Sequence, residues 1–165
     1  MDELDFYVTA ISAQRVLGLG MGSSLEEVTH SFGKDFVEDV HGPLLRRDYG
    51  LLEFTFHRYD RWKCCLIGVQ VHRILWGDNE VIPDAVSAKY GSFSPHLAAA
   101  TLSRALEARG VDLDGAARQT FSDSIKMSLV ELGVEIIVLK GQDDERLQGD
   151  VWSIHLSEPK RPQLT

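Results

Sequence analysis

The chain has 165 residues, enough for one domain of ordinary size or for two small subdomains that share a core. Its 17 Lys and Arg are outnumbered by 25 Asp and Glu, and the net charge of −8 repels a phosphate backbone, so no direct nucleic-acid partner is expected. Hydrophobic residues make up 44% of the sequence, which is ample for a packed interior. The two cysteines, Cys64 and Cys65, are adjacent, which excludes a disulfide framework and favours small core or half-buried residues.

The first five residues are acidic and lack the basic region and apolar core of a signal peptide. No run reaches the roughly 18 apolar residues of a membrane span. We therefore expect a cytoplasmic protein without a membrane partner. An acidic surface speeds encounter with a basic protein, so a basic protein partner is expected, while the oligomeric state stays open.

Residues 3–16 are predicted to form an opening helix because their apolar side chains fall at helical spacing, although residues 6–11 would also suit a strand. A second helix is marked by a capping box, formed either by Ser23 with Glu26 or by Ser24 with Glu27. Gly33 is placed to end this helix in a left-handed turn.

Strands are predicted next, at residues 36–40, 52–57 and 67–72. The last two alternate, with one buried face and one face that is either wet or covered by a partner. Residues 78–94 read as a link, and a further helix is expected from residues 94–95 to Gly110. Strand candidates then follow at residues 118–121, 125–132, 134–139 and 151–156, with an acidic hairpin loop at residues 141–145.

The two halves of the sequence form a weak internal repeat. Residues 50–56 with 71–74 resemble residues 133–138 with 151–154, and a helical stretch precedes each pair. The sequence therefore predicts an α+β fold of two helix-plus-antiparallel-sheet units in tandem, forming one compact domain or a continuous sheet. The units are expected at residues 1–80 and 95–158, joined by a linker at 81–94 and followed by a flexible tail at 159–165.

No catalytic residue, cofactor site or metal site is predicted. The run Gly18-x-Gly20-x-Gly22 has Ser23 where a dinucleotide fingerprint needs glycine, so a hinge is favoured over a phosphate-binding loop. The six histidines show no paired metal-ligand spacing, and residues 122–124 read as a turn, not as part of a hydrolase site. Cys64 would need a cationic neighbour or a helix N-terminus to react, and a structural role is favoured.

Polar side chains assigned to the outward face form the candidate partner-binding surface: Glu53, His57, Gln70, His72, Glu135 and His155. If their strands are neighbours, these groups could converge with metal-like or acid/base chemistry; otherwise they are scattered over a solvated face. Aromatic residues gather around the first unit and mark either an interface or strand-end packing: Tyr49, Tyr59, Trp62 and Trp76.

The pattern Gly20-Met21, Val28 and Gly33, followed by strands, resembles the helix opening of the beta-lactamase inhibitory protein and of small lipoproteins of outer-membrane assembly. The resemblance covers residues 18–75 and implies folds built from helix-plus-hairpin units, a unit that occurs twice in the inhibitory protein. That protein is secreted and carries disulfides, so the architecture is taken from the resemblance and its target is not.

A small, acidic protein with a two-faced sheet also resembles, at the level of the class, the immunity proteins of bacterial polymorphic toxin systems. The leading hypothesis is therefore a non-enzymatic binding protein, an immunity or inhibitor protein that occludes a basic protein partner. The alternative is an enzyme or small-ligand-binding protein that uses a pocket between the two units.

Overall fold

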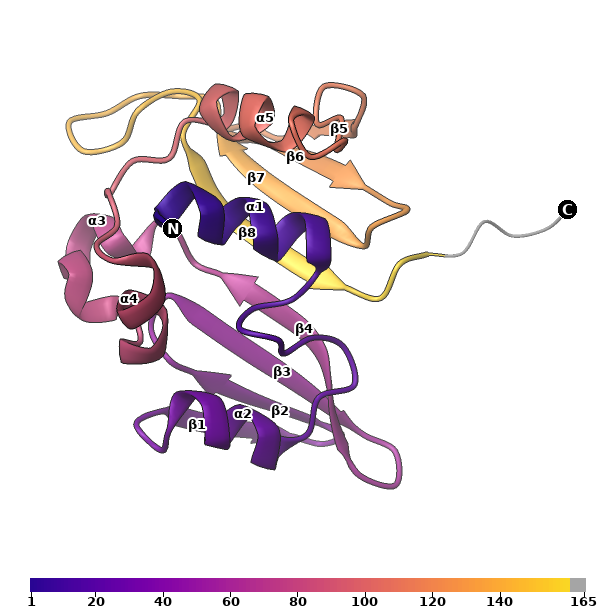
Figure 1. Cartoon of the computed structure of the whole chain (residues 1–165). Coiled ribbons are helices and arrows are strands. Elements are labelled where there is room, and N and C mark those ends of the chain that lie inside the picture. The colour runs from indigo at the N-terminus through magenta and orange to yellow at the C-terminus, as the bar shows by residue number, and fades with distance from the viewer. Residues whose placement is uncertain (161–165) are drawn as a thin grey trace, which may run out of the picture.

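The computed structural model describes residues 1–160 and shows an α+β fold, as the sequence predicts (Figure 1). The helices are α1 (Glu3–Ala13), α2 (Leu25–Phe32), α3 (Arg73–Gly77), the 3-10 helix η1 (Asp78–Val81), α4 (Asp84–Tyr90) and α5 (Ala99–Glu107). The strands are β1 (Val37–His41), β2 (Leu44–Asp48), β3 (Leu52–Arg58), β4 (Trp62–Val69), β5 (Ala117–Thr120), β6 (Ser124–Leu129), β7 (Val134–Leu139) and β8 (Val151–Ser157).

The strands of both units join in one antiparallel sheet of order β1-β2-β3-β4-β8-β7-β6-β5. From either edge to the centre, each unit contributes its four strands in chain order: β1 to β4 from one edge and β5 to β8 from the other. The last strands of the two units, β4 and β8, therefore meet at the centre, and the sheet has a pseudo-twofold axis there. The continuous sheet allowed by the sequence analysis is the form that is found.

The internal repeat is confirmed at β3 and β7, which begin just after Gly50-Leu51 and Gly133, respectively. Both strands also lose register with their neighbour at the same place, between the fourth and fifth residues, Thr55/Phe56 and Ile137/Val138. The second part of the predicted repeat, which pairs residues 71–74 with residues 151–154, is wrong. The counterpart of β8 is β4, which ends at Val69, and residues 71–74 lie beyond it at the start of α3. The bulge and Gly68 disturb the alternation of β4, so the apolar pattern alone misplaces its end.

Two capping boxes define the N-termini of α1 and α2. Asp2 accepts a hydrogen bond from the N–H of Asp5 (3.0 Å), and the Asp5 carboxylate accepts one from the N–H of Asp2 (2.9 Å). At α2 the box uses Ser24 and Glu27, one of the two pairs predicted. Each box satisfies donors that the helix itself cannot.

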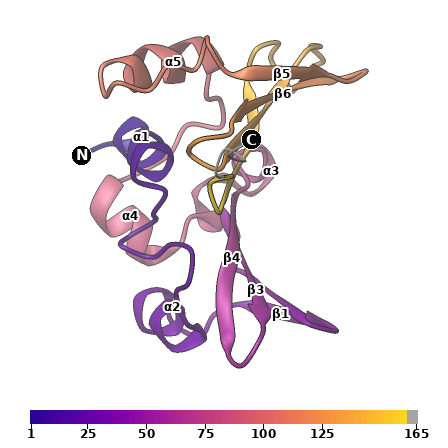
Figure 2. The same cartoon turned by 90° about the vertical axis from the view of Figure 1, so that its right-hand side faces the viewer.

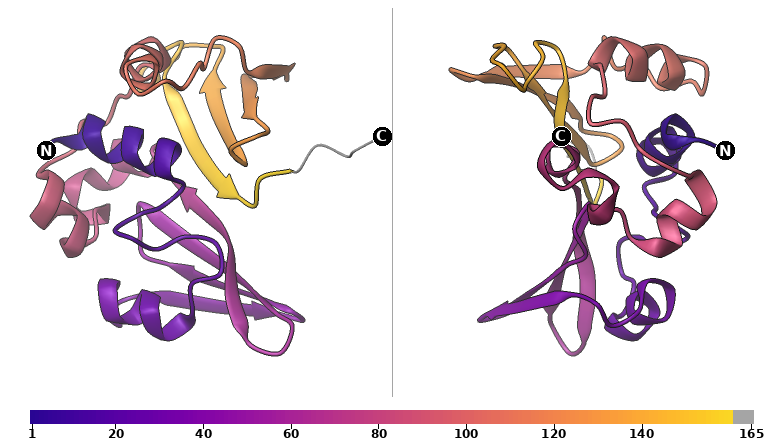
Figure 3. Two further views of the ribbon diagram at one scale, coloured as in Figure 1. Left: turned by 45° about the vertical axis from the view of Figure 1, so that its right-hand side comes forward. Right: turned by 90° about the vertical axis from the view of Figure 1, so that its left-hand side faces the viewer.

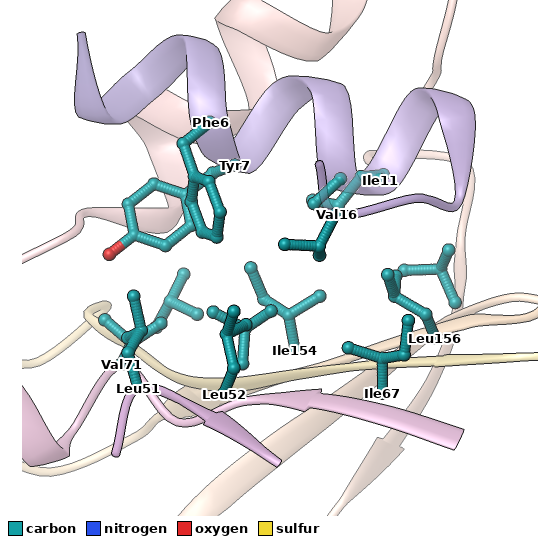
Figure 4. Close-up of a cluster of buried hydrophobic side chains, with 14 of the residues drawn as sticks. Phe6, Tyr7, Ile11, Val16, Leu51, Leu52, Ile67, Val71, Ile154 and Leu156 are labelled. Atoms are coloured by element: carbon teal, nitrogen blue, oxygen red, sulfur yellow. The ribbon is translucent and has the colours of Figure 1, made fainter. Parts of the chain in front are cut away.

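Helix α1 lies across the seam between β4 and β8 and holds the two units together. Its side chains Phe6, Tyr7 and Ile11 are buried over the inner face of the sheet (Figure 4). They pack above residues of both units, which include Ile67 from β4 and Ile154 from β8. The inner side of the seam is therefore filled by side chains.

The structure differs from the sequence analysis between the units. The segment expected as a linker contains α4, whose Val86 and Tyr90 are buried, with the Tyr90 ring 5.3 Å from that of Phe6. Helix α5 begins at Ala99, later than expected, because the preceding residues run beside β8: the N–H of Val151 donates to the carbonyl of Leu97 (2.8 Å). The domain boundaries stay predictions.

The expected tail, 159–165, is described only as far as Lys160, whose N–H donates to the carbonyl of Val130 (3.3 Å). The remainder of that prediction lies outside the described residues. Within residues 1–160, no helix combines the length and apolar character needed to cross a membrane.

Candidate functional site

The outer face of the sheet carries the candidate site. Helices α1, α2, α4 and α5 all cover the inner face, whereas the outer face has no helical layer (Figures 2 and 3). Outward side chains of β3 and β7 are consequently half-buried, while their inward neighbours are fully buried. The two-faced character predicted for these strands is confirmed.

Strand pairing brings three of the predicted residues into one row. Glu53 lies opposite Gly68, Gly68 opposite His155, and His155 opposite Glu135. Glu53 and Glu135 are each the second residue of equivalent strands, so they flank the Gly68–His155 pair beside the pseudo-twofold axis. Sequence alternation predicts that these side chains face outward; their convergence depends on the β4–β8 pairing.

Glu53 is held by other side chains of the outer face. It accepts hydrogen bonds from Arg73 Nη2 (2.6 Å) and from Gln70 Nε2 (3.2 Å), and Arg73 Nη1 also donates to Asp48 (2.8 Å). A side chain at Gly68 would meet the Gln70 amide, so the glycine leaves room for this network. The charge of Glu53 is thus compensated inside the protein.

His155 is the only imidazole in the central row. Its Nε2 lies 3.0 Å from Ser153 Oγ, but Ser153 is only 3% exposed, and no residue among 1–160 hydrogen-bonds His155 Nδ1. A buried hydroxyl next to a histidine without an orienting carboxylate lacks the access and geometry of a nucleophile. Glu135, on the other side of the row, forms an ion pair with Lys126 (3.6 Å).

His72 lies beyond the end of β4, not on a strand as predicted, because the strand stops at Val69. Its ring stacks on Trp152 with the centroids 4.2 Å apart and the planes within 1°. Trp76, from α3, completes the cluster edge-to-face on Trp152 (5.9 Å). We call His72, Trp76 and Trp152 the aromatic cluster.

A β-bulge in β8 places Trp152 next to His72 and Trp76. Ile137 pairs with Ser153 but Val138 pairs with Val151, so Trp152 is the extra residue. Simple alternation assigns Trp152 to the core face, and that assignment is wrong. A bulge is a property of two paired strands, so the hydrophobic pattern of β8 alone does not identify Trp152 as the extra residue.

His57 does not join the central row. It pairs with Lys63 at the far end of β3, and its ring lies 4.2 Å from that of Tyr59. Gln70 is linked to the row by its hydrogen bond to Glu53. His72 stacks on Trp152, which lies on the same strand as His155. The predicted set is therefore divided into a central group and one distant histidine.

The two cysteines lie at buried or half-buried positions, as predicted. Cys64 is buried, and desolvation raises the pKa of its thiol to about 12. Cys65 is half-buried and its Sγ lies 3.4 Å from the carbonyl oxygen of Thr55; burial raises its pKa too. Raised pKa values disfavour the reactive thiolate.

The predicted aromatic group is also divided: Tyr49 is buried, Trp62 is half-buried, and Trp76 and Tyr59 are 57% and 82% exposed.

The glycine-rich segment is bonded to the sheet. The N–H of Gly22 donates to the carbonyl of Cys64, and the N–H of Cys64 donates to Ser23, both at 2.8 Å. The N–H of Gly20 is taken by Ser23 Oγ (3.1 Å). These contacts fit a connection into α2. No cluster of three or more His, Cys, Asp or Glu side chains suited to a metal occurs in the described part of the chain.

A hollow of about 280 Å³ adjoins the central row on the outer side of the second unit. Its polar lining includes Lys126, Glu135, Glu158 and Lys160. It is at the lower end of the sizes found for small-molecule pockets, which begin at roughly 300 Å³. It lies over β5–β7 and the segment after β8, not over the seam between the units.

Acid should weaken the fold through the outer-face histidines. Desolvation lowers the pKa of His155 and of His72 below the ordinary value of 6.5, against the opposing pull of Glu53 on both and of Glu135 on His155. As the pH falls through and below 6.5, the unfolded chain therefore binds more protons than the folded one. The free energy of unfolding that the neutral histidines contribute above that pH is then lost.

We expect the urea midpoint of the native protein to drop between about pH 7.5 and about pH 5.5, and to drop less in a His72→Gln/His155→Gln variant. The exposed His41→Gln is the matched control and should retain the native loss. An identical loss in the double variant would show that other groups cause it.

No family model matches the chain, and no curated protein matches it significantly. A solved structure that is similar is that of a DUF4309 family protein (YjgB) from Bacillus subtilis subsp. subtilis str. 168. It is 16% identical, the alignment covers 93% of each chain, and the TM-score is 0.41.

Proposed function

We propose that the chain is a non-enzymatic protein-binding protein that uses the outer face of its sheet to occlude a basic protein partner, as immunity and inhibitor proteins do. The observation that carries the proposal is the outer face itself. It lacks a helical layer, has a half-buried row of Glu53, His155 and Glu135 at its centre, and is bordered by the exposed rings of Tyr59 and Trp76. Aromatic side chains are enriched in protein interfaces.

Charge supports the basic character of the proposed partner. The net charge of −8 attracts a basic protein over long range and speeds its association. On the outer face, however, Glu53 and Glu135 are already paired with Arg73 and Lys126. Long-range attraction would therefore come from the molecule as a whole, and the residence time from close contacts on the face.

The test compares one substitution on the two sides of the molecule. Thr55 lies on the outer face of β3 and Thr101 is exposed on α5, so Thr55→Arg and Thr101→Arg add the same charge and bulk to opposite faces. The full chain is immobilised in native cell lysate, captured proteins are identified by mass spectrometry, and the dissociation constant is measured with the purified partner. We expect Thr55→Arg to weaken binding at least about tenfold and Thr101→Arg to leave it unchanged.

Loss of binding with Thr101→Arg alone, or capture of no protein by the native chain, would overturn the proposal. The melting temperature of each variant separates a changed surface from a changed fold.

The alternative, an enzyme or small-ligand-binding protein, is favoured by one observation, the hollow beside Glu135. Its lysines would suit an acidic small molecule. A small molecule that remains bound in native mass spectrometry of the purified chain, and is lost in Lys126→Gln, would support this alternative.

A further inference from the structure

Two acidic segments far apart in sequence meet at the exposed ring of Trp76. Trp76 Nε1 donates a hydrogen bond to Glu145 Oε2 (3.0 Å), which joins α3 to the loop between β7 and β8. Both segments carry further exposed carboxylates: Asp78 and Glu80 follow Trp76 in the chain, and Asp144 precedes Glu145. Trp76 itself is 57% exposed, which is unusual for so large an apolar side chain.

The neighbouring ring of the aromatic cluster shows what such a surface can hold. The guanidinium of Arg146 lies over Trp152, 5.8 Å from the ring centroid, and the same guanidinium forms an ion pair with Asp143. Trp152 therefore already carries a cation that is neutralised by a carboxylate of the same loop. This pairing is a cation–π contact supported by a charge-assisted hydrogen bond.

Trp76 has the same elements without the cation. It stands edge-to-face to Trp152 and has the Glu145 carboxylate at its rim. None of the cationic side chains within residues 1–160 lies over its ring. Arg73, the base nearest in sequence, is engaged by Asp48 and Glu53.

We propose that the face of Trp76, with Glu145 at its rim and Asp144 next to Glu145 in the chain, is the docking point for an arginine side chain of the basic partner. The inference rests on the proposed function and names the chemistry that recognises the partner. Arginine fits better than lysine because its planar guanidinium stacks on an indole while its edge donates to a carboxylate. Arg146 on Trp152 is the intramolecular example of the same contact.

The test uses the full chain labelled with ¹⁵N and a probe peptide, acetyl-Gly-Arg-Gly-amide. The indole N–H signals of the three tryptophans are followed during titration, with the citrulline peptide as the uncharged isostere. We expect the Trp76 signal to shift and to saturate with arginine and not with citrulline. Trp62 is the internal control, because Arg58 already lies over its ring (5.3 Å).

Matched variants identify the carboxylates. Glu145→Gln/Asp144→Asn should raise the dissociation constant of the arginine peptide at least about threefold, whereas Glu131→Gln, at an exposed acid outside this surface, should leave it unchanged. The inference is overturned if the Trp76 signal does not saturate, if citrulline acts as well as arginine, or if the double variant binds like the native chain.

These outcomes are separate from those of the proposed function. Arginine binding at Trp76 without partner binding on the outer face would overturn the proposed function alone. Partner binding that depends on Thr55 and not on Trp76 would overturn this inference alone.

Discussion

Gly133→Ala is expected to lower the free energy of unfolding by roughly 3 kcal/mol or more, a large part of the stability of a domain of this size. Gly133 has φ +67°, a conformation that costs other residues about 1–2 kcal/mol. An alanine Cβ would also lie well inside van der Waals contact of the Ser157 carbonyl oxygen, which belongs to the backbone at the end of β8. The backbone of one strand would have to move, which would strain the 2.8 Å hydrogen bond from the N–H of Ser157 to the carbonyl of Gly133.

Gly149→Ala is the matched control. Gly149 also has a positive φ, +86°, but nothing lies within 4 Å of a Cβ built there. It should lose only the conformational part, about 1 kcal/mol. Urea denaturation of both variants measures the difference, and equal losses would mean that the close approach of Gly133 to Ser157 has no energetic weight.

Gly133 has a counterpart, Gly50, in the internal repeat. In the first unit, Gly50 precedes β3 as Gly133 precedes β7, and it likewise has a positive φ (+90°) and a backbone carbonyl, that of Val81, in the place of a Cβ. The carbonyls come from different elements, so each unit has a glycine in close contact with a different neighbour just before its equivalent strand. The recurring Gly in the sequence therefore reflects a recurring backbone requirement.

The sequence is sufficient for the local features of the fold. Capping boxes predict where α2 begins because both partners are within one turn of the chain. Alternation predicts which side chains of β3, β7 and most of β8 face outward because neighbouring residues point to opposite sides. Glu53, Glu135 and His155 are correctly assigned to the outer face for this reason.

Features that depend on distant segments are not predictable from the local pattern. The central row requires β4 and β8 to be neighbours, and nothing in either strand alone specifies that pairing. The direction of Trp152 requires a bulge opposite β7, and the compensation of Glu53 requires Arg73, which lies beyond the predicted strand. The sequence thus identifies the surface but not which of its charges are free.

Ile11→Ala is expected to lower the free energy of unfolding by about 3 kcal/mol, within the range of roughly 2–5 kcal/mol for removing a buried aliphatic side chain. Ile11 is fully buried on α1, above the seam between β4 and β8. Its loss leaves a cavity against strands of both units, so both units should be destabilised together. Hydrogen exchange under native conditions should then accelerate at the amides of β3 and of β7 alike.

Ile125→Ala removes the same side chain from a half-buried position on β6, near the edge of the second unit. It should cost less, and any local acceleration of exchange should stay on the β5–β7 side of the sheet. If Ile11→Ala accelerated exchange in only one unit, α1 would stabilise that unit alone, and the two halves of the sheet would unfold independently. Coupled exchange would instead mean that the outer face behaves as one rigid surface, because the helix that joins its two halves lies directly behind the central row.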